Sequence, residues 1–216
     1  MIETKYPYMV IAVSGKAQSG KDTLCETIEE VFAKDFDIFK FAFADELKEI
    51  SKQVFGLTDH QVRTQEGKRE YLDIDMTPRN VLQQVGEAMK KIDPYCWTKI
   101  IQRRIKQVFK DHILNNCEEK PIVILLSDLR FISELEFLES FIPSENLYTI
   151  RLIRTERMMT GKAAKHESEI NLDNYKGWHH ILFNKGGLEE LKLTATGLIE
   201  NQIKDNHFNK VGKNAR

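Results

Sequence analysis

Short, continuous runs of apolar residues alternate along the chain with stretches in which apolar residues recur every three or four positions. The continuous runs predict five strands, at residues 9–13, 38–43, 121–126, 147–153 and 181–183. Runs of this kind are typical of strands buried on both faces of a parallel sheet. The helical spacing predicts helices that begin after Lys21, near Leu47, at Pro78 behind a Thr77 cap, near Tyr95 and at Leu188.

This alternation of strands and helices predicts an α/β fold with a mainly parallel sheet and right-handed crossovers. Residues 57–76 are mostly polar and charged, and predict a connection that contains a helical turn or two. We expect one domain over residues 1–203, followed by a polar, disordered tail at 204–216.

A glycine-rich motif of the form GxxxxGK lies between the first predicted strand and the first predicted helix. Its glycines let backbone N–H groups face a polyphosphate, while the helix contributes its positive end and the lysine reaches the β- and γ-phosphates. The Ser or Thr that usually follows the lysine is replaced by aspartate. The predicted nucleotide-binding residues are Gly15, Lys16, Ala17, Gln18, Ser19, Gly20, Lys21, Asp22 and Thr23.

A metal site is predicted beside this motif. Asp128 ends the strand predicted at 121–126, where a carboxylate can organise Mg²⁺. Asp22 can hold the ion directly or through water, and Thr23 can instead contact the α-phosphate. The predicted metal ligands are therefore Asp22, Thr23 and Asp128. The alternative interpretation of the motif is a Gly/Ser-rich turn before a helix.

Composition and charge narrow the class of protein further. Lys and Arg number 32 and Asp and Glu 33, so the formal net charge of −1 disfavours sequence-independent nucleic-acid binding. No apolar run is long enough to cross a membrane. The three cysteines, Cys25, Cys96 and Cys117, show no disulfide or zinc-ligand spacing, so we expect a cytoplasmic protein.

The motif alone leaves a GTPase, a motor, an ATPase and a small-molecule kinase open. A GTPase would carry DxxG and NKxD, whereas the chain has Asp-Leu-Arg-Phe from Asp128 and Asn-Lys-Gly-Gly from Asn184. A kinase for an anionic acceptor needs arginines outside the glycine-rich motif, which we call the phosphate loop, because phosphoryl transfer depends on positioning and charge neutralisation. Candidate arginines lie at 79, 130, 151, 154 and 157.

Taken in order, several motifs resemble the deoxynucleoside monophosphate kinases of bacteriophages. These are GKAQSGKDT from Gly15, FADELK from Phe43, Thr-Pro-Arg from Thr77 with Leu82-Gln83 and Gly86, Asp93-Pro94 with Trp97, SDLRF from Ser127 with Glu134, HESE from His166, and Asn184 before Gly187. The resemblance spans residues 9 to 200 and implies a P-loop NTPase-type three-layer fold. It also implies an acceptor-binding region at about 45–100 and a lid at about 154–169. Thr160-Gly161-Lys162 has no counterpart in the pattern.

The resemblance implies transfer of the γ-phosphate of ATP to a deoxynucleoside monophosphate (dNMP), with Mg²⁺. Catalysis would involve Lys21, Asp128, Arg130, Arg154 and Arg157. The implied acceptor-binding residues are Asp45, Lys48, Arg79, Gln83, Trp97, Arg130, His166 and Glu169. The implied partners are small molecules, without nucleic acid or membrane. A homodimer is left open, and a viral chain would act in the host cytoplasm.

Each role has a structural alternative. Arg130 can pair with Glu134 along a helix, Asp45 can cap a helix beside a solvated Lys48, and Trp97 can lie in the core. Gln83 can be an exposed helical residue, and Arg154 and Arg157 can belong to a solvated basic loop. His166 and Glu169 can instead ligate a metal ion. Two rival functions also remain. The motifs GKAQSGKD, Ser127–Arg130, Glu167–Glu169 and Leu172–Asn174 resemble animal-type phosphomevalonate kinase, and a P-loop switch without kinase activity is the other.

Overall fold

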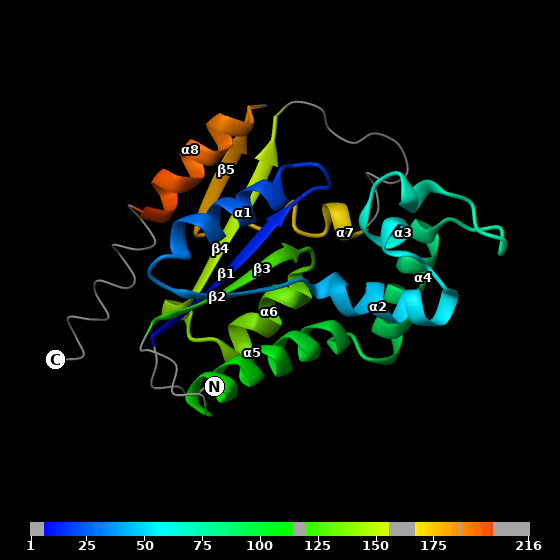
Figure 1. The fold of residues 1–216 in the computed structure, drawn as a ribbon, viewed down its shortest axis with the longest axis horizontal. Coiled ribbons are helices and arrows are strands. Elements are labelled where there is room, and N and C mark those ends of the chain that lie inside the picture. Colours follow the sequence, from blue (N-terminus) through cyan, green and yellow to red (C-terminus); the bar gives the residue numbers. More distant parts are fainter. Residues whose placement is uncertain (1–6, 115–119, 156–166, 186, 201–216) are drawn as a thin grey trace. The chain divides into compact units, whose positions relative to one another are not determined.

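The computed structural model describes residues 7–114, 120–155, 167–185 and 187–200. Within it the chain divides into two compact units, one made of residues up to Ala42 and from Arg103 onward, the other of Phe43–Gln102. Figure 1 follows the chain through its elements. The tail predicted at 204–216 lies outside the described residues, as does most of the predicted lid.

The first unit is built on a five-stranded sheet whose strands follow the order β2-β3-β1-β4-β5. All four neighbouring pairs are parallel, with Val10 of β1 opposite Ile124 of β3 and Leu147 of β4. The strands are β1 (Tyr8–Gly15), β2 (Asp37–Phe41), β3 (Ile122–Leu129), β4 (Leu147–Arg154) and β5 (His180–Asn184). The predicted strands and the parallel sheet are confirmed, except that β2 stops at Phe41 because Phe43 already begins a helix.

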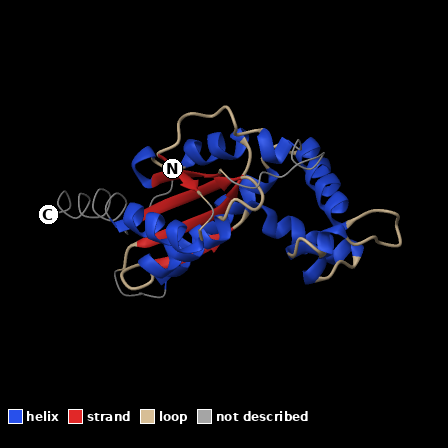
Figure 2. Cartoon of the chain, turned by 90° about the horizontal axis from the view of Figure 1, so that it is seen from above, coloured by secondary structure: helices blue, strands red, loops and turns tan. Residues whose placement is uncertain are grey.

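Helices cover both faces of this sheet. Met9, Ile11 and Val13 of β1 join a core cluster with residues of α1 (Lys21–Phe32) and α8 (Leu188–Leu198). Successive side chains of a strand point to opposite faces, so Tyr8 points the other way, where its ring meets Phe109 of α5 (Cys96–Leu114) at 4.9 Å between centroids. The other elements of this unit are α6 (Ile132–Phe141), the 3₁₀ turn η2 (Ser144–Asn146) and α7 (Glu167–Ile170). In Figure 2 the strands lie between the helices, which confirms the three-layer fold.

The second unit is helical. It contains α2 (Phe43–Phe55), α3 (Asp59–Arg63), the 3₁₀ turn η1 (Gly67–Arg69), α4 (Pro78–Ile92) and the first residues of α5. Thr77 Oγ1 accepts the backbone N–H of Asn80 at 3.3 Å, so the predicted cap with proline behind it is confirmed. Leu57, Val62 and Val81 form a small core of their own, which ties the predicted connection to α4.

Two further properties of the described residues bear on the sequence predictions. Cys25 is buried and Cys96 half-buried, and both are free thiols, while Cys117 lies outside the described residues. Within the described ranges, no helix combines the length and the apolar character of a membrane span.

A candidate phosphate-binding site

The glycine-rich motif forms a tight loop between the end of β1 and the start of α1. A Cβ on Gly15 would lie 2.6 Å from Ser19 Oγ and 2.8 Å from the carbonyl oxygen of Leu152, so this position accepts only glycine. Gly20 caps α1 with φ of 100°, a left-handed conformation that L side chains rarely adopt. Local backbone geometry therefore requires glycine at both ends of the motif.

Lys21 lies almost buried at the first position of α1, where its ammonium group closes the loop. Its Nζ donates to the carbonyl oxygen of Lys16 at 2.9 Å. Burial is the main reason that its pKa falls to about 8, and Arg130 lowers it further, while Glu169, Asp22 and Asp128 oppose both. An anionic ligand would stabilise the desolvated ammonium group of Lys21, because it would replace the lost hydration.

The loop is anchored by the last residues of β4 and β5. Asn184 Nδ2 donates to the carbonyl oxygen of Ser19 at 2.9 Å in a buried position. Arg154 Nη1 donates to the carbonyl oxygen of Gln18 at 2.9 Å, and Gln18 itself has a positive φ of 63°. These two contacts occupy the carbonyl oxygens of Gln18 and Ser19 and fix the conformation of the loop.

A cavity of about 460 Å³ opens beside the loop, and its lining comes from the second half of the motif and from the end of β4. The lining residues are Gln18, Gly20, Lys21, Asp22, Thr23 and Arg154. Ser19 Oγ and Arg154 Nε are buried polar atoms without a hydrogen-bond partner within the described part of the chain. Buried polar atoms in native proteins normally have a hydrogen-bond partner, so water, an ion or a ligand can complete this site.

Asp128 is the penultimate residue of β3, and Arg130 comes directly after the strand, close to the loop. Burial lowers the pKa of the Arg130 guanidinium, but the charges of Asp128, Glu169 and Glu134 outweigh it, so the pKa stays above its usual value. Glu134 Oε2 accepts the backbone N–H groups of Arg130 and Phe131 at 2.9 and 3.1 Å and so caps α6. Arg130 is therefore a permanently charged group held among carboxylates.

Acidic residues of α7 and the turn after it also contact the loop. Glu169 accepts the backbone N–H of Ala17 at 2.7 Å and Arg130 Nη1 at 2.6 Å. Asp173 bridges Lys16 Nζ at 2.6 Å and Arg151 Nη2 at 2.7 Å. Asp173 is a residue to which sequence reasoning gave no role. Its separation from Lys16 along the chain leaves no local signal, because only the fold brings the two together.

The metal-ligand predictions are compatible with the chemistry of this site. Asp22 is exposed in the first turn of α1, and both Asp22 and Asp128 lie close enough to Lys21 to raise its pKa against the effect of burial. Among the described residues, no three His, Cys, Asp or Glu side chains are grouped as a metal site. Mg²⁺ does not require such a group, since it is commonly held by one or two carboxylates together with water and substrate phosphates. These residues therefore fit Mg²⁺.

The predicted acceptor-binding residues of the second unit lie on α2, α4 and the start of α5. Asp45 and Lys48 pair at 3.2 Å, and Arg79 Nη2 donates to Gln65 Oε1 at 2.9 Å. Gln83 is half-buried and Trp97 is only 5% exposed. Their substrate contacts stay predictions, as do those of Arg157 and His166, which lie outside the described residues.

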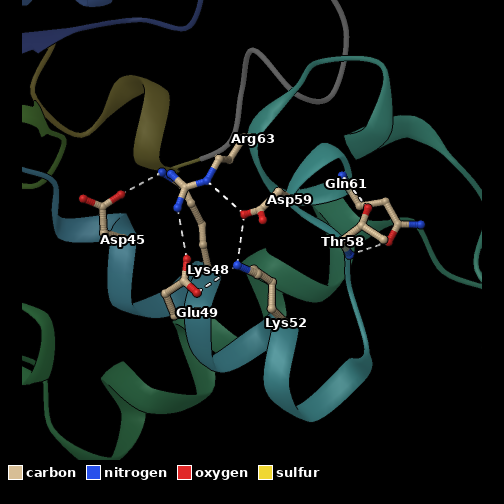
Figure 3. A network of polar contacts seen from close by, with 8 residues as sticks. All are labelled: Asp45, Lys48, Glu49, Lys52, Thr58, Asp59, Gln61 and Arg63. Carbon is tan, nitrogen blue, oxygen red and sulfur yellow. Dashed lines mark hydrogen bonds and ion pairs between the residues drawn. The ribbon is translucent and has the colours of Figure 1, made fainter.

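Alternating charges continue along α2 into α3. Lys52 pairs with Glu49 and Asp59, both at 2.9 Å, and Arg63 contacts the same two carboxylates at 3.0 and 3.2 Å. Figure 3 shows this network beside the pair of Asp45 and Lys48. Since these side chains are partly exposed, the network adds little stability, but it fixes where each charge points.

Comparison with known proteins shows a similarity in sequence that extends over most of the chain. A protein of Acanthamoeba polyphaga mimivirus, described as "Putative deoxynucleotide monophosphate kinase", is 25% identical over 201 residues, which cover 89% of this chain and 97% of that protein. No family model matches the chain. The resemblance to deoxynucleoside monophosphate kinases that the motifs predict is thus confirmed over nearly the whole chain.

Solved structures resemble this fold at low identity. A sugar kinase of Janibacter sp. HTCC2649 has a TM-score of 0.46 and 11% identity, covering 91% of this chain and 96% of its own. A gluconokinase of Sinorhizobium meliloti 1021 has a TM-score of 0.45 and 15% identity, covering 94% of this chain and 98% of its own.

Proposed function

We propose that this chain is a deoxynucleoside monophosphate kinase, which transfers the γ-phosphate of ATP to a dNMP to give a dNDP and ADP. The observation that carries the proposal is the phosphate loop, with a desolvated Lys21, fixed glycines and buried polar atoms that have no partner among the described residues, beside a cavity. The similarity to the viral protein over nearly its whole length supports the choice of acceptor.

On the donor side, backbone N–H groups of the loop would bind the phosphates of ATP, and Lys21 would reach the β- and γ-phosphates. Arg154 lines the same cavity and is the one described arginine of the predicted lid. Asp22, Thr23 and Asp128 would hold Mg²⁺, which neutralises phosphate charge when bound. Because phosphoryl transfer needs positioning and charge stabilisation more than covalent help, these groups suffice for the donor half.

During transfer an oxygen of the acceptor phosphate bonds to the γ-phosphorus while the bond to the bridging oxygen of ADP breaks. Arg130 is suited to stabilise this transfer, since its guanidinium keeps its charge and offers paired donors to phosphate oxygens. No strong general base is required, because the attacking phosphate oxygen is already anionic. The role of Arg157 stays a prediction from the resemblance.

The second unit would bind the acceptor. Asp45, Lys48, Arg79, Gln83 and Trp97 all belong to it, and each is a polar or aromatic group suited to a phosphate, a sugar or a base. Arg79 lies in the first turn of α4, where the helix dipole disfavours a cation and stabilises an anionic ligand. A homodimer and a cytoplasmic location remain predictions.

The test is ADP release from Mg·ATP in a coupled assay, with dAMP, dGMP, dCMP, dTMP, dUMP and phosphomevalonate as separate acceptors. Lys21→Ala should reduce turnover about a hundredfold or more, because it removes the charge that meets the transferring phosphate. Lys34→Ala makes the same change at an exposed lysine just beyond α1 and should leave turnover unchanged.

Turnover with one or more dNMPs, lost in Lys21→Ala and kept in Lys34→Ala, would support the proposal and identify the base. Activity on phosphomevalonate alone would overturn the proposal that a dNMP is the acceptor, but the proposed ATP-binding role of the phosphate loop would stand. ATP binding without ADP release from any acceptor would show a nucleotide-binding protein that is not a kinase of this class.

A further inference from the structure

The carboxylate of Glu169 already lies where the phosphate loop and Arg130 both offer hydrogen-bond donors. Oε2 accepts the N–H of Ala17 at 2.7 Å, and Oε1 accepts Nη1 of Arg130 at 2.6 Å. The Glu169 side chain is only 9% exposed. Each of its oxygens thus has a separate donor, one from a loop amide and one from a guanidinium.

These are the donors with which proteins bind phosphate. Backbone N–H groups of a glycine-rich loop and a guanidinium both prefer anionic oxygens. Glu169 also acts on Lys21, since its charge raises the pKa of that lysine against burial. The loop therefore holds an anion supplied by the chain itself.

The segment that carries Glu169 is fixed at several points. Asp173 bridges Lys16 and Arg151, and Asn171 Oδ1 accepts the backbone N–H of Ile132 at 2.7 Å. These contacts keep the Glu169 carboxylate beside the loop at a high effective concentration, so it competes efficiently with a free ligand.

We propose that Glu169 is an internal competitor for the phosphate groups of the nucleotide, which displace its carboxylate from Ala17 N–H and Arg130 when they bind. This inference rests on the proposed function in that the ligand is a polyphosphate. It assigns Glu169 a role opposite to that of a residue that grips substrate. Removing its charge should strengthen nucleotide binding instead of weakening it.

The experiment measures binding of ATP and of inorganic tripolyphosphate to the full-length protein by isothermal titration calorimetry. Glu169→Gln keeps the shape and removes the charge, and should tighten binding of both ligands by about tenfold, the scale expected from losing a charge-assisted contact. Glu167→Gln is the matched control, because Glu167 is exposed two residues away and contacts Asn171 instead of the loop. It should leave both affinities unchanged.

A second measurement needs no substitution. In the wild-type protein, amide hydrogen exchange should become faster across residues 167–173 when tripolyphosphate binds, while exchange across the loop becomes slower. A residue that closes over substrate would instead make its own segment exchange more slowly. Slower or unchanged exchange across 167–173 would overturn the proposal.

The outcomes separate this inference from the proposed function. If wild type binds ATP, Lys21→Ala does not, and Glu169→Gln binds no more tightly than wild type, the competitor role is refuted and the phosphate site stands. If neither wild type nor Glu169→Gln binds ATP or tripolyphosphate, both proposals fail. Tighter binding confined to Glu169→Gln supports both.

Discussion

Gly20 is a position where a single added methyl group should disrupt the phosphate loop. The residue has φ of 100°, and a Cβ placed on it would lie 2.8 Å from Asn184 Nδ2 and 3.0 Å from Leu191 Cδ2. Both neighbours are buried, and the Asn184 amide is the group that donates to the Ser19 carbonyl. Gly20→Ala must therefore strain the backbone and push this amide away.

The two effects can be added in rough terms. An alanine in the left-handed conformation costs about 1 kcal/mol, and a buried carbonyl that loses its donor costs about 1–3 kcal/mol. The free energy of unfolding should therefore fall by about 2–4 kcal/mol. For a chain of this size each kcal/mol corresponds to about 2–4 °C, so the melting temperature should fall by roughly 5–15 °C.

The matched control is Gly197→Ala in α8, where a Cβ would meet no atom of the described residues within 4 Å. Alanine favours a helix over glycine by about 0.5–1 kcal/mol, so this variant should melt slightly higher than wild type. Thermal unfolding of wild type and both variants, followed by circular dichroism, checks the contrast. If Gly20→Ala melts with wild type while Gly197→Ala rises, the strained geometry assigned to the loop is wrong.

Two other predictions concern buried groups near the same loop. Burial raises the pKa of the Cys25 thiol from its ordinary value of 9.0 to about 12. Iodoacetamide at pH 8 should therefore alkylate Cys25 about a thousandfold more slowly than an unhindered thiol, and the rate should rise tenfold per pH unit. Mass spectrometry of the folded and the urea-treated protein measures the labelling of Cys25, and equal labelling in both would contradict this prediction. Arg151→Met removes a guanidinium that donates to Ser14 at 2.8 Å and to Asp173 at 2.7 Å, so the free energy of unfolding in urea should fall by about 2 kcal/mol. Arg103→Met, at an exposed position, should leave it unchanged. Equal urea midpoints for the two variants would show that the contacts of Arg151 contribute nothing to stability.

Local sequence signals predicted much of this fold correctly. The continuous apolar runs indicated buried parallel strands because such strands have no polar face to show. Thr77 followed by Pro78 placed the start of α4, since capping depends only on neighbouring residues. The glycine spacing at Gly15 and Gly20 predicted the loop for the same reason, as backbone conformation restricts the residue type at each position.

The contacts that complete the site were beyond such signals. The resemblance implies that Glu169 binds the acceptor, which stays a prediction, and no sequence signal indicated the contacts of its carboxylate with Ala17 and Arg130. The contacts of Asp173 with Lys16 and of Asn184 with the loop join residues more than a hundred positions apart, and no periodicity encodes such a pair. The Arg130 guanidinium contacts Glu169 while Glu134, the neighbour along the helix, caps backbone amides. Only tertiary structure decides between these partners.

The parallel sheet also sets an order in which the chain can fold during synthesis. β1 is the central strand, and the strands that pair with it, β3 and β4, begin at Ile122 and Leu147. β1 therefore stays unpaired while the intervening residues are synthesised. The helical unit at Phe43–Gln102 is continuous in sequence and relies on short-range contacts, which form fast. A ribosome-bound chain long enough for Gln102 to have left the exit tunnel should therefore already protect the helical unit from protease while β1 remains cleavable, and the phosphate loop should take shape only after β4 has emerged.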